Sequence, residues 1–163
     1  MKAGAPRPYL VRSTEGSAKA LIEKLKAASA RPRVFAQALH PGAIASMRHL
    51  ELAWLLAESA FRNGGNRART LENEALLRAA ATARIGEAIR RAGARSPREF
   101  VLLTDAKGAR LKRLLDAIGG TAEKPEFKPD EKEVCALFGI SGKLLENYSL
   151  EELVLEKVAL SGA

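Results

Sequence analysis

The side chains that most often perform catalysis are few in this sequence, and their spacing matches no catalytic or metal-binding motif. His40 precedes a Pro-Gly turn and His49 lies in a helical pattern, and neither shows the His-x-x-His or His-Glu-x-x-His spacing of a zinc site. Cys135 is the only cysteine, and its apolar neighbours favour a buried thiol with a raised pKa. We therefore expect no metal, no cofactor and no catalytic residue, and we interpret His49 as a packing or hydrogen-bonding residue.

Glycine-rich segments can bind phosphate through backbone amides, but those present here lack the required pattern. The Gly-Gly pairs at 64–65 and 119–120 follow predicted helices and belong to neither GxxxxGK[ST] nor GxGxxG. Segment 139–143 lacks the first glycine and the preceding strand of a phosphate loop. No G-x-S-x-G elbow supports a hydrolase. We expect caps and turns at these glycines.

Arginines in the middle of the chain are the remaining candidates for chemistry, here the recognition of phosphate. Guanidinium groups match phosphate geometry, so this stretch is a candidate phosphate-binding face. The same residues can also be solvated helix faces paired with Glu72, Glu74 and Glu87, and the sequence leaves both readings open. One tryptophan and two tyrosines do not support an aromatic platform for stacking bases. The arginines are Arg62, Arg67, Arg69, Arg78, Arg84, Arg90 and Arg91, with Arg95 and Arg98 just beyond.

Composition limits the classes of protein that the chain can represent. Its 163 residues, 47% of them hydrophobic, suit one domain over 1–163 with a core of its own. The 27 basic and 19 acidic residues give a net charge of +8, which favours an anionic partner such as nucleic acid. No apolar run approaches the length of a membrane span, so we expect a cytoplasmic protein without membrane contact.

Hydrophobic periodicity predicts an α/β (mixed α+β) fold. Strands are expected at 9–11, 33–39, 100–103 and 121–127, the third buried on both faces and the fourth at an edge. Helices are expected at 18–28, 43–61, 85–92 and 107–118, and others begin after the capping residues Thr70, Asp130 and Ser149. This order predicts a four-stranded mixed sheet flanked by helices, with a helical middle segment and C-terminal helices.

An ordered series of segments resembles one known family, the kinase-binding (TPRKB-like) subunit of the KEOPS tRNA-modification complex. His49-Leu50 with Ala53 and Ala57 resembles its His-x-x-x-Ala-x-x-x-Ala helix. Segment 78–85, followed by Glu87-Ala88-Ile89, resembles its A-S-G-x-R-Q-I-x-x-A-I signature, with Ala81, Ala83 and Arg84 in place of the family's Gly, Arg and Gln. Segments 93–103, 118–120 and 154–160 follow in family order, so the resemblance covers essentially the whole chain.

The resemblance implies a non-catalytic, regulatory accessory subunit. Such a subunit binds the small atypical KEOPS kinase and recruits tRNA through its 3′ CCA end, so that another subunit can transfer threonylcarbamoyl to adenosine 37. Other KEOPS subunits are indirect partners. The kinase contact is expected on the C-terminal helix, which carries more apolar residues than one buried face needs, although a helix packed wholly inside its own domain is the alternative. These residues are Leu153, Val154, Leu155, Val158, Ala159 and Leu160.

The tRNA contact is expected in the helical middle, on the signature and the arginines around it. The residues are Arg67, Arg69, Arg78, Ala81, Thr82, Arg84, Ile85, Arg90 and Arg91. Two other classes remain open. A stand-alone basic nucleic-acid-binding module would ignore the CCA end and bind duplex DNA, and an enzyme would turn over nucleotide on its own.

Overall fold

A four-stranded antiparallel sheet is the centre of the first part of the fold. The computed structural model describes residues 4–162, in which β1 (Arg7–Ser13), β2 (Ala36–Leu39), β3 (Phe100–Thr104) and β4 (Gly120–Glu123) form one sheet in the order β2-β3-β1-β4. All three pairings are antiparallel. The expected α/β class and its four strands are confirmed, but the sheet is antiparallel where a mixed sheet was expected.

The antiparallel arrangement follows from how two strand-helix-strand units interleave. Helix α1 (Ala18–Ala30) joins β1 to β2, and these two strands lie on either side of β3. Helix α5 (Ala109–Ala117) joins β3 to β4, and these lie on either side of β1. Each unit leaves a gap that a strand of the other unit fills, so neighbours run in opposite directions in a split β-α-β topology of the ferredoxin-like type.

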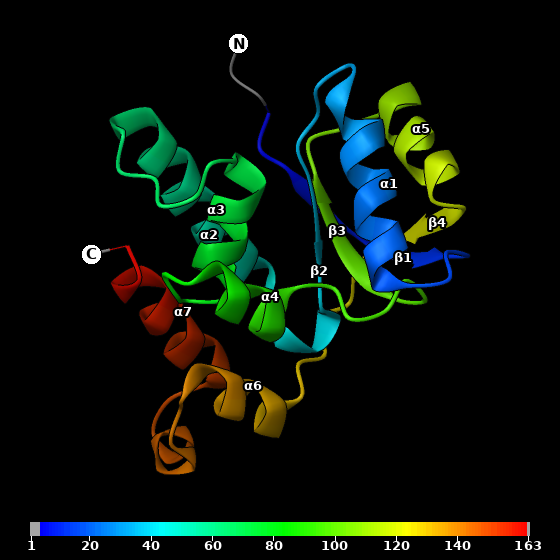
Figure 1. Ribbon diagram of the computed structural model, residues 1–163. Coiled ribbons are helices and arrows are strands. Elements are labelled where there is room, and N and C mark those ends of the chain that lie inside the picture. Colours follow the sequence, from blue (N-terminus) through cyan, green and yellow to red (C-terminus); the bar gives the residue numbers. More distant parts are fainter. Residues whose placement is uncertain (1–3, 163) are drawn as a thin grey trace. The chain divides into compact units, whose positions relative to one another are not determined.

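Helices α1 and α5 lie side by side along the sheet (Figure 1). Leu21 and Leu25 of α1 share one apolar cluster with Phe100 and Leu102 of β3 and with Ile118, which follows α5. All five residues of β3 are buried, as predicted for a central strand, and β4 lies at an edge. The sheet and its two helices therefore have a core of their own.

The chain divides into two compact units, which we call the sheet unit (Met1–His40 with Ala94–Glu126) and the helical unit (Pro41–Gly93 with Phe127–Ala163). The single domain expected over 1–163 stays a prediction. The helical unit contains the elements η1 (Pro41–Ala43), α2 (Met47–Asn63), α3 (Leu71–Ala79), α4 (Ile85–Ala92), α6 (Glu131–Phe138), η2 (Gly142–Glu146) and α7 (Leu150–Leu160).

Capping residues define where the helices of the helical unit begin. The side chains of Thr70, Asp130 and Ser149 each accept a hydrogen bond from the backbone N–H three residues later, which confirms the predicted starts of α3, α6 and α7. Ser149 and Glu152 form the expected reciprocal capping box. Helix α2 begins later than predicted, because Pro41–Ala43 forms a short 3-10 turn and Ser46 caps the helix.

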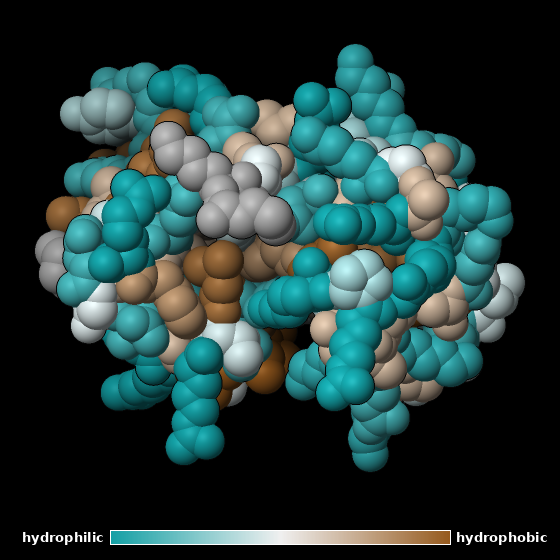
Figure 2. Space-filling model, turned by 90° about the horizontal axis from the view of Figure 1, so that it is seen from above, coloured by the Kyte–Doolittle hydropathy of each residue, from teal (hydrophilic) through white to brown (hydrophobic). Residues whose placement is uncertain are grey.

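Hydrophilic side chains dominate the face of the protein shown in Figure 2. This agrees with the net charge of +8. Within residues 4–162, no helix combines the length and the apolar character that a membrane crossing requires.

Candidate functional site

His49 is a buried structural residue of the helical unit. Its Nε2 lies 2.8 Å from the carbonyl oxygen of Ala79, its Nδ1 accepts the N–H of Ala45, and its ring meets Phe138 edge-on with centroids 5.8 Å apart. Nδ1 is therefore the acceptor, and the neutral ring donates from Nε2. Burial lowers the pKa of His49 to about 4, although the hydrogen bond to Ala79 acts in the opposite direction. The prediction of a packing and hydrogen-bonding residue is confirmed.

A buried ion pair within α3 links the segment before this helix to the end of α7. The guanidinium of Arg78 lies 2.7 Å from Glu74 Oε1, and both side chains are almost fully buried. Glu74 Oε2 also accepts the N–H groups of Arg67 and Ala68, while Arg78 and Arg67 each donate to the carbonyl oxygen of Ser161. Burial would raise the pKa of Glu74, but these hydrogen bonds and the charge of Arg78 outweigh it and hold the pKa below its usual value.

The turn after α3 places Ala81 in a conformation that favours glycine. Ala81 has a φ of 49°, the one non-glycine residue with positive φ among residues 4–162. Its N–H donates to the carbonyl of Arg78, and the N–H of Thr82 donates to that of Leu77. This pair of bonds is a Schellman motif, which places the residue at position 81 in the left-handed region where glycine is favoured. Alanine stands at this position, where the signature that the sequence resembles has glycine.

Helix α4 presents two exposed isoleucines next to arginines. Ile85 and Ile89 are 43% and 54% exposed and share one face, since they are four residues apart. Arg84 and Arg90 are exposed beside them, and the side chain of Arg90 lies 3.7 Å from Glu87. The hydrogen bond from Thr82, followed by the charges of the nearby arginines, lowers the pKa of Glu87. Such a surface has apolar area for a base and cations for phosphates.

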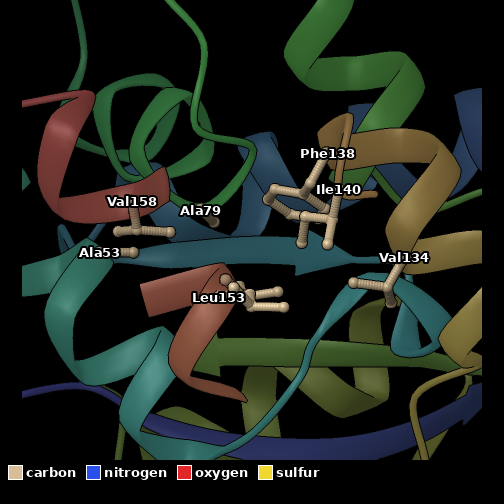
Figure 3. Packing of buried hydrophobic residues seen from close by; sticks show 8 residues of the cluster. Ala53, Ala79, Val134, Phe138, Ile140, Leu153 and Val158 are labelled. Carbon is tan, nitrogen blue, oxygen red and sulfur yellow. The ribbon is translucent and has the colours of Figure 1, made fainter. Parts of the chain in front are cut away.

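Helix α7 divides between core and surface. Leu153, Val154 and Val158 are buried with Ala53, Ala79 and the α6 residues Val134 and Phe138, as Figure 3 shows for most of them. Leu160 is 64% exposed, Ala159 is exposed and Leu155 is half-buried. One side of the helix therefore belongs to the core, and its last turn offers apolar surface to solvent.

A comparison with models of known protein families matches almost the whole chain. The model of the family described as "Kinase binding protein CGI-121" matches residues 16–162. The chain belongs to the CGI-121 family. This is the KEOPS family that the sequence resembles, and its members are non-catalytic kinase-binding subunits. A comparison with the sequences of curated proteins gives no match.

The expected tRNA residues of this CGI-121 protein fall into two groups. Arg69, Arg84, Ile85 and Arg90 are exposed; the last three lie within or directly after the signature, and Arg69 lies before α3. Arg78 is buried in its ion pair, Arg91 is bonded to Glu87 and to the carbonyl of Ala80, and Arg67 donates to Ser161. Ala81 and Thr82 shape the turn. The first group can meet a ligand, and the second group holds the fold together.

One residue of this surface was not among those predicted. Ile89 is more exposed than Ile85, which was predicted. Its signal is in the sequence, because Ile89 follows Ile85 by four residues and so shares its face of α4, beside the small buried Ala88 and Ala92. In the described part of the chain, no cluster of His, Cys, Asp and Glu side chains is arranged to hold a metal ion. Burial raises the pKa of Cys135, as predicted.

Proposed function

We propose that this CGI-121 protein is a cytoplasmic accessory subunit that binds the small KEOPS kinase and recruits tRNA by its 3′ CCA end. Threonylcarbamoyl transfer to adenosine 37 is then performed by another subunit. The family match over residues 16–162 carries the proposal. Two separate solvent-facing apolar surfaces of the helical unit support it, since a subunit that couples two partners needs two contact sites.

The C-terminal half of α7 carries the proposed kinase surface, which we define as Leu155, Ala159 and Leu160. An exposed leucine at 64% adjoining further apolar residues is typical of a protein-binding surface. Leu153, Val154 and Val158 support this surface from beneath by anchoring the helix in the core. Their expected role in kinase binding is therefore indirect.

The turn at 80–84 and the exposed face of α4 are the proposed site for the CCA end. Single-stranded RNA is recognised through unstacked bases that lie on apolar or planar side chains, with cations at the phosphates. Ile85 and Ile89 supply the apolar area, and Arg84 and Arg90 supply the cations. Within residues 4–162, Arg84 forms no ion pair with an acid, so its guanidinium is available to phosphate.

Two matched substitutions separate the two contacts. Leu160→Glu and Ile89→Glu each place a carboxylate on an exposed apolar position of the same unit, so neither should disturb the core. We expect L160E to weaken kinase binding and to leave tRNA binding unchanged. We expect I89E to weaken tRNA binding and to leave kinase binding unchanged. The assays are a pull-down with the cognate kinase, and fluorescence anisotropy with intact and CCA-trimmed tRNA.

Removal of the CCA end from the tRNA supplies the control for the tRNA contact. If the proposal holds, intact tRNA binds the wild type more tightly than trimmed tRNA, and I89E removes that difference. Equal binding of intact tRNA, trimmed tRNA and duplex DNA would instead favour the stand-alone nucleic-acid-binding module. Normal kinase binding by both L160E and L155E would show that the kinase surface is wrongly assigned.

A further inference from the structure

One end of the sheet gathers basic residues that the proposed function does not use. The register pairs Thr104, the last residue of β3, with Arg7 on one side and with Ala36 on the other. The start of β1, the loop from α1 into β2 and the loop from β3 into α5 therefore lie at the same end. These segments carry Arg7, Arg31 and Lys107, and helix α5, which begins at this end, adds Arg110 and Arg113. We call these five residues the cationic end.

Packing holds the two loops of the cationic end together. Val34, Ala106 and Leu114 form a small buried cluster, against which Ala28 and Leu111 pack. Arg113 donates to the carbonyl oxygen of Arg31 over 2.5 Å, which ties α5 to the end of α1. The backbone that carries these basic side chains is therefore held in place by packing and by this hydrogen bond.

The charge of the cationic end is not neutralised by acids. All five of its basic residues are exposed, and none of them forms an ion pair with a carboxylate in the part of the chain that the structure describes. Asp105, the acid of these segments, already accepts the backbone N–H of Phe35 through Oδ1.

Two of these cations stand where they are unfavourable for folding. Lys107 and Arg110 flank the N-terminus of α5, whose first turn holds no acid. The N-terminus of a helix carries partial positive charge and repels cations. Because both positions disfavour a cation in the folded protein and yet hold one, they indicate a binding role rather than a stabilising one.

We infer that the cationic end binds the phosphate backbone of RNA, as a second contact that is independent of the CCA end. Four of its five cations are arginines, whose planar guanidinium groups bind phosphate in a bidentate manner. A backbone contact adds affinity without reading sequence. The inference rests on the proposed function in one respect, that the polyanion is tRNA.

The test compares two double variants that remove the same charges from opposite ends of the sheet unit. K107Q/R110Q removes one lysine and one arginine from the cationic end. K19Q/R98Q removes the same pair from the first turn of α1 and from the segment before β3, where both residues are also exposed. Binding of intact and CCA-trimmed tRNA is measured by anisotropy between 50 and 200 mM salt, as a range in which counterion release is visible.

If the inference holds, K107Q/R110Q lowers the slope of log Kd against log salt by about 1.5, since each lost phosphate contact removes roughly 0.7–0.9. It weakens intact and trimmed tRNA by the same factor, K19Q/R98Q leaves the slope unchanged, and the swap K107R/R110K restores it. The melting temperature of K107Q/R110Q does not fall, because both cations oppose the dipole of α5.

Three results would overturn the inference. In the first, the slope of log Kd against log salt is the same for K107Q/R110Q as for the wild type. In the second, K107Q/R110Q and K19Q/R98Q lower this slope by the same amount. In the third, K107Q/R110Q loses kinase binding while its tRNA binding stays normal. The last result would assign the surface to an acidic protein. The two proposals fail separately. If intact and CCA-trimmed tRNA bind equally well but K107Q/R110Q still lowers the salt slope, only the CCA site is refuted. If intact tRNA binds more tightly than trimmed tRNA but K107Q/R110Q leaves the salt slope unchanged, only the cationic end is refuted.

Discussion

Acidification from pH 7.5 to 5.5 should destabilise this protein through His49. Its ring is fully buried, and burial lowers its pKa from 6.5 to about 4. The unfolded chain therefore takes up the proton more readily than the folded chain. The stability contributed by the neutral ring is complete above pH 6.5 and is lost as pH falls toward 4. Linkage gives a loss of about 1.4 kcal/mol between pH 7.5 and 5.5, and of roughly 3 kcal/mol below pH 4.

The assay is urea unfolding of the wild type and of His49→Gln at both pH values. Glutamine keeps an N–H donor near the carbonyl of Ala79 but does not titrate. The wild type should lose about 1.4 kcal/mol more than the variant on acidification. The pH range stays above the region in which carboxylates titrate, and His40 is present in both proteins, so the difference isolates His49. Parallel pH curves for the two proteins would show that His49 is not held neutral by burial.

Three further predictions concern the same unit. Arg78→Met should lower the unfolding free energy by about 3–5 kcal/mol, because it leaves the buried carboxylate of Glu74 unpaired, whereas Arg62→Met, in an exposed pair, should cost at most about 1 kcal/mol in the same urea titration. Ala81→Gly should stabilise the protein by about 0.5–1 kcal/mol, since the strain of positive φ outweighs the added entropy of the unfolded chain; a lower melting temperature would contradict this. Ser149→Ala should cost about 1 kcal/mol by removing the capping box of α7, and calorimetry that shows no change would count against it.

Local signals predicted most elements of the fold, and non-local pairing caused the main error. Thr70, Asp130 and Ser149 cap helices where their spacing to later residues indicated, because a cap depends on a few adjacent groups. Gly64 ends α2 in the left-handed conformation, as expected. The direction of strand pairing, in contrast to a helix cap, depends on residues that are far apart in the sequence. The pattern of β3 shows that it is buried, but it does not show that β3 inserts between β1 and β2.

The candidate site was predictable in its location but not in the roles of its residues. Arg78 and Arg84 look alike in the sequence, yet one is buried against Glu74 and the other is exposed. What separates them is the path of the chain at 67–68 and at 161, which brings three backbone groups to one buried pair. For α7, the excess of apolar residues predicted a binding helix, and a helix packed wholly inside its own domain was the alternative. The structure assigns Val154 to the core and leaves Leu160 exposed.

The two proposed surfaces of the helical unit share one core, and this limits which variants can separate their functions. Val158 of the proposed kinase helix lies in the same cluster as Ala79, and Ala81 of the signature turn packs against that cluster. Arg78, one turn before this site, is bonded to the end of α7 through Ser161. A substitution at Val154 or Val158 should therefore disturb both surfaces at once, because closely packed cores transmit strain. Loss of kinase and tRNA binding together would reveal only a damaged core, so solvent-facing residues are required to assign either contact.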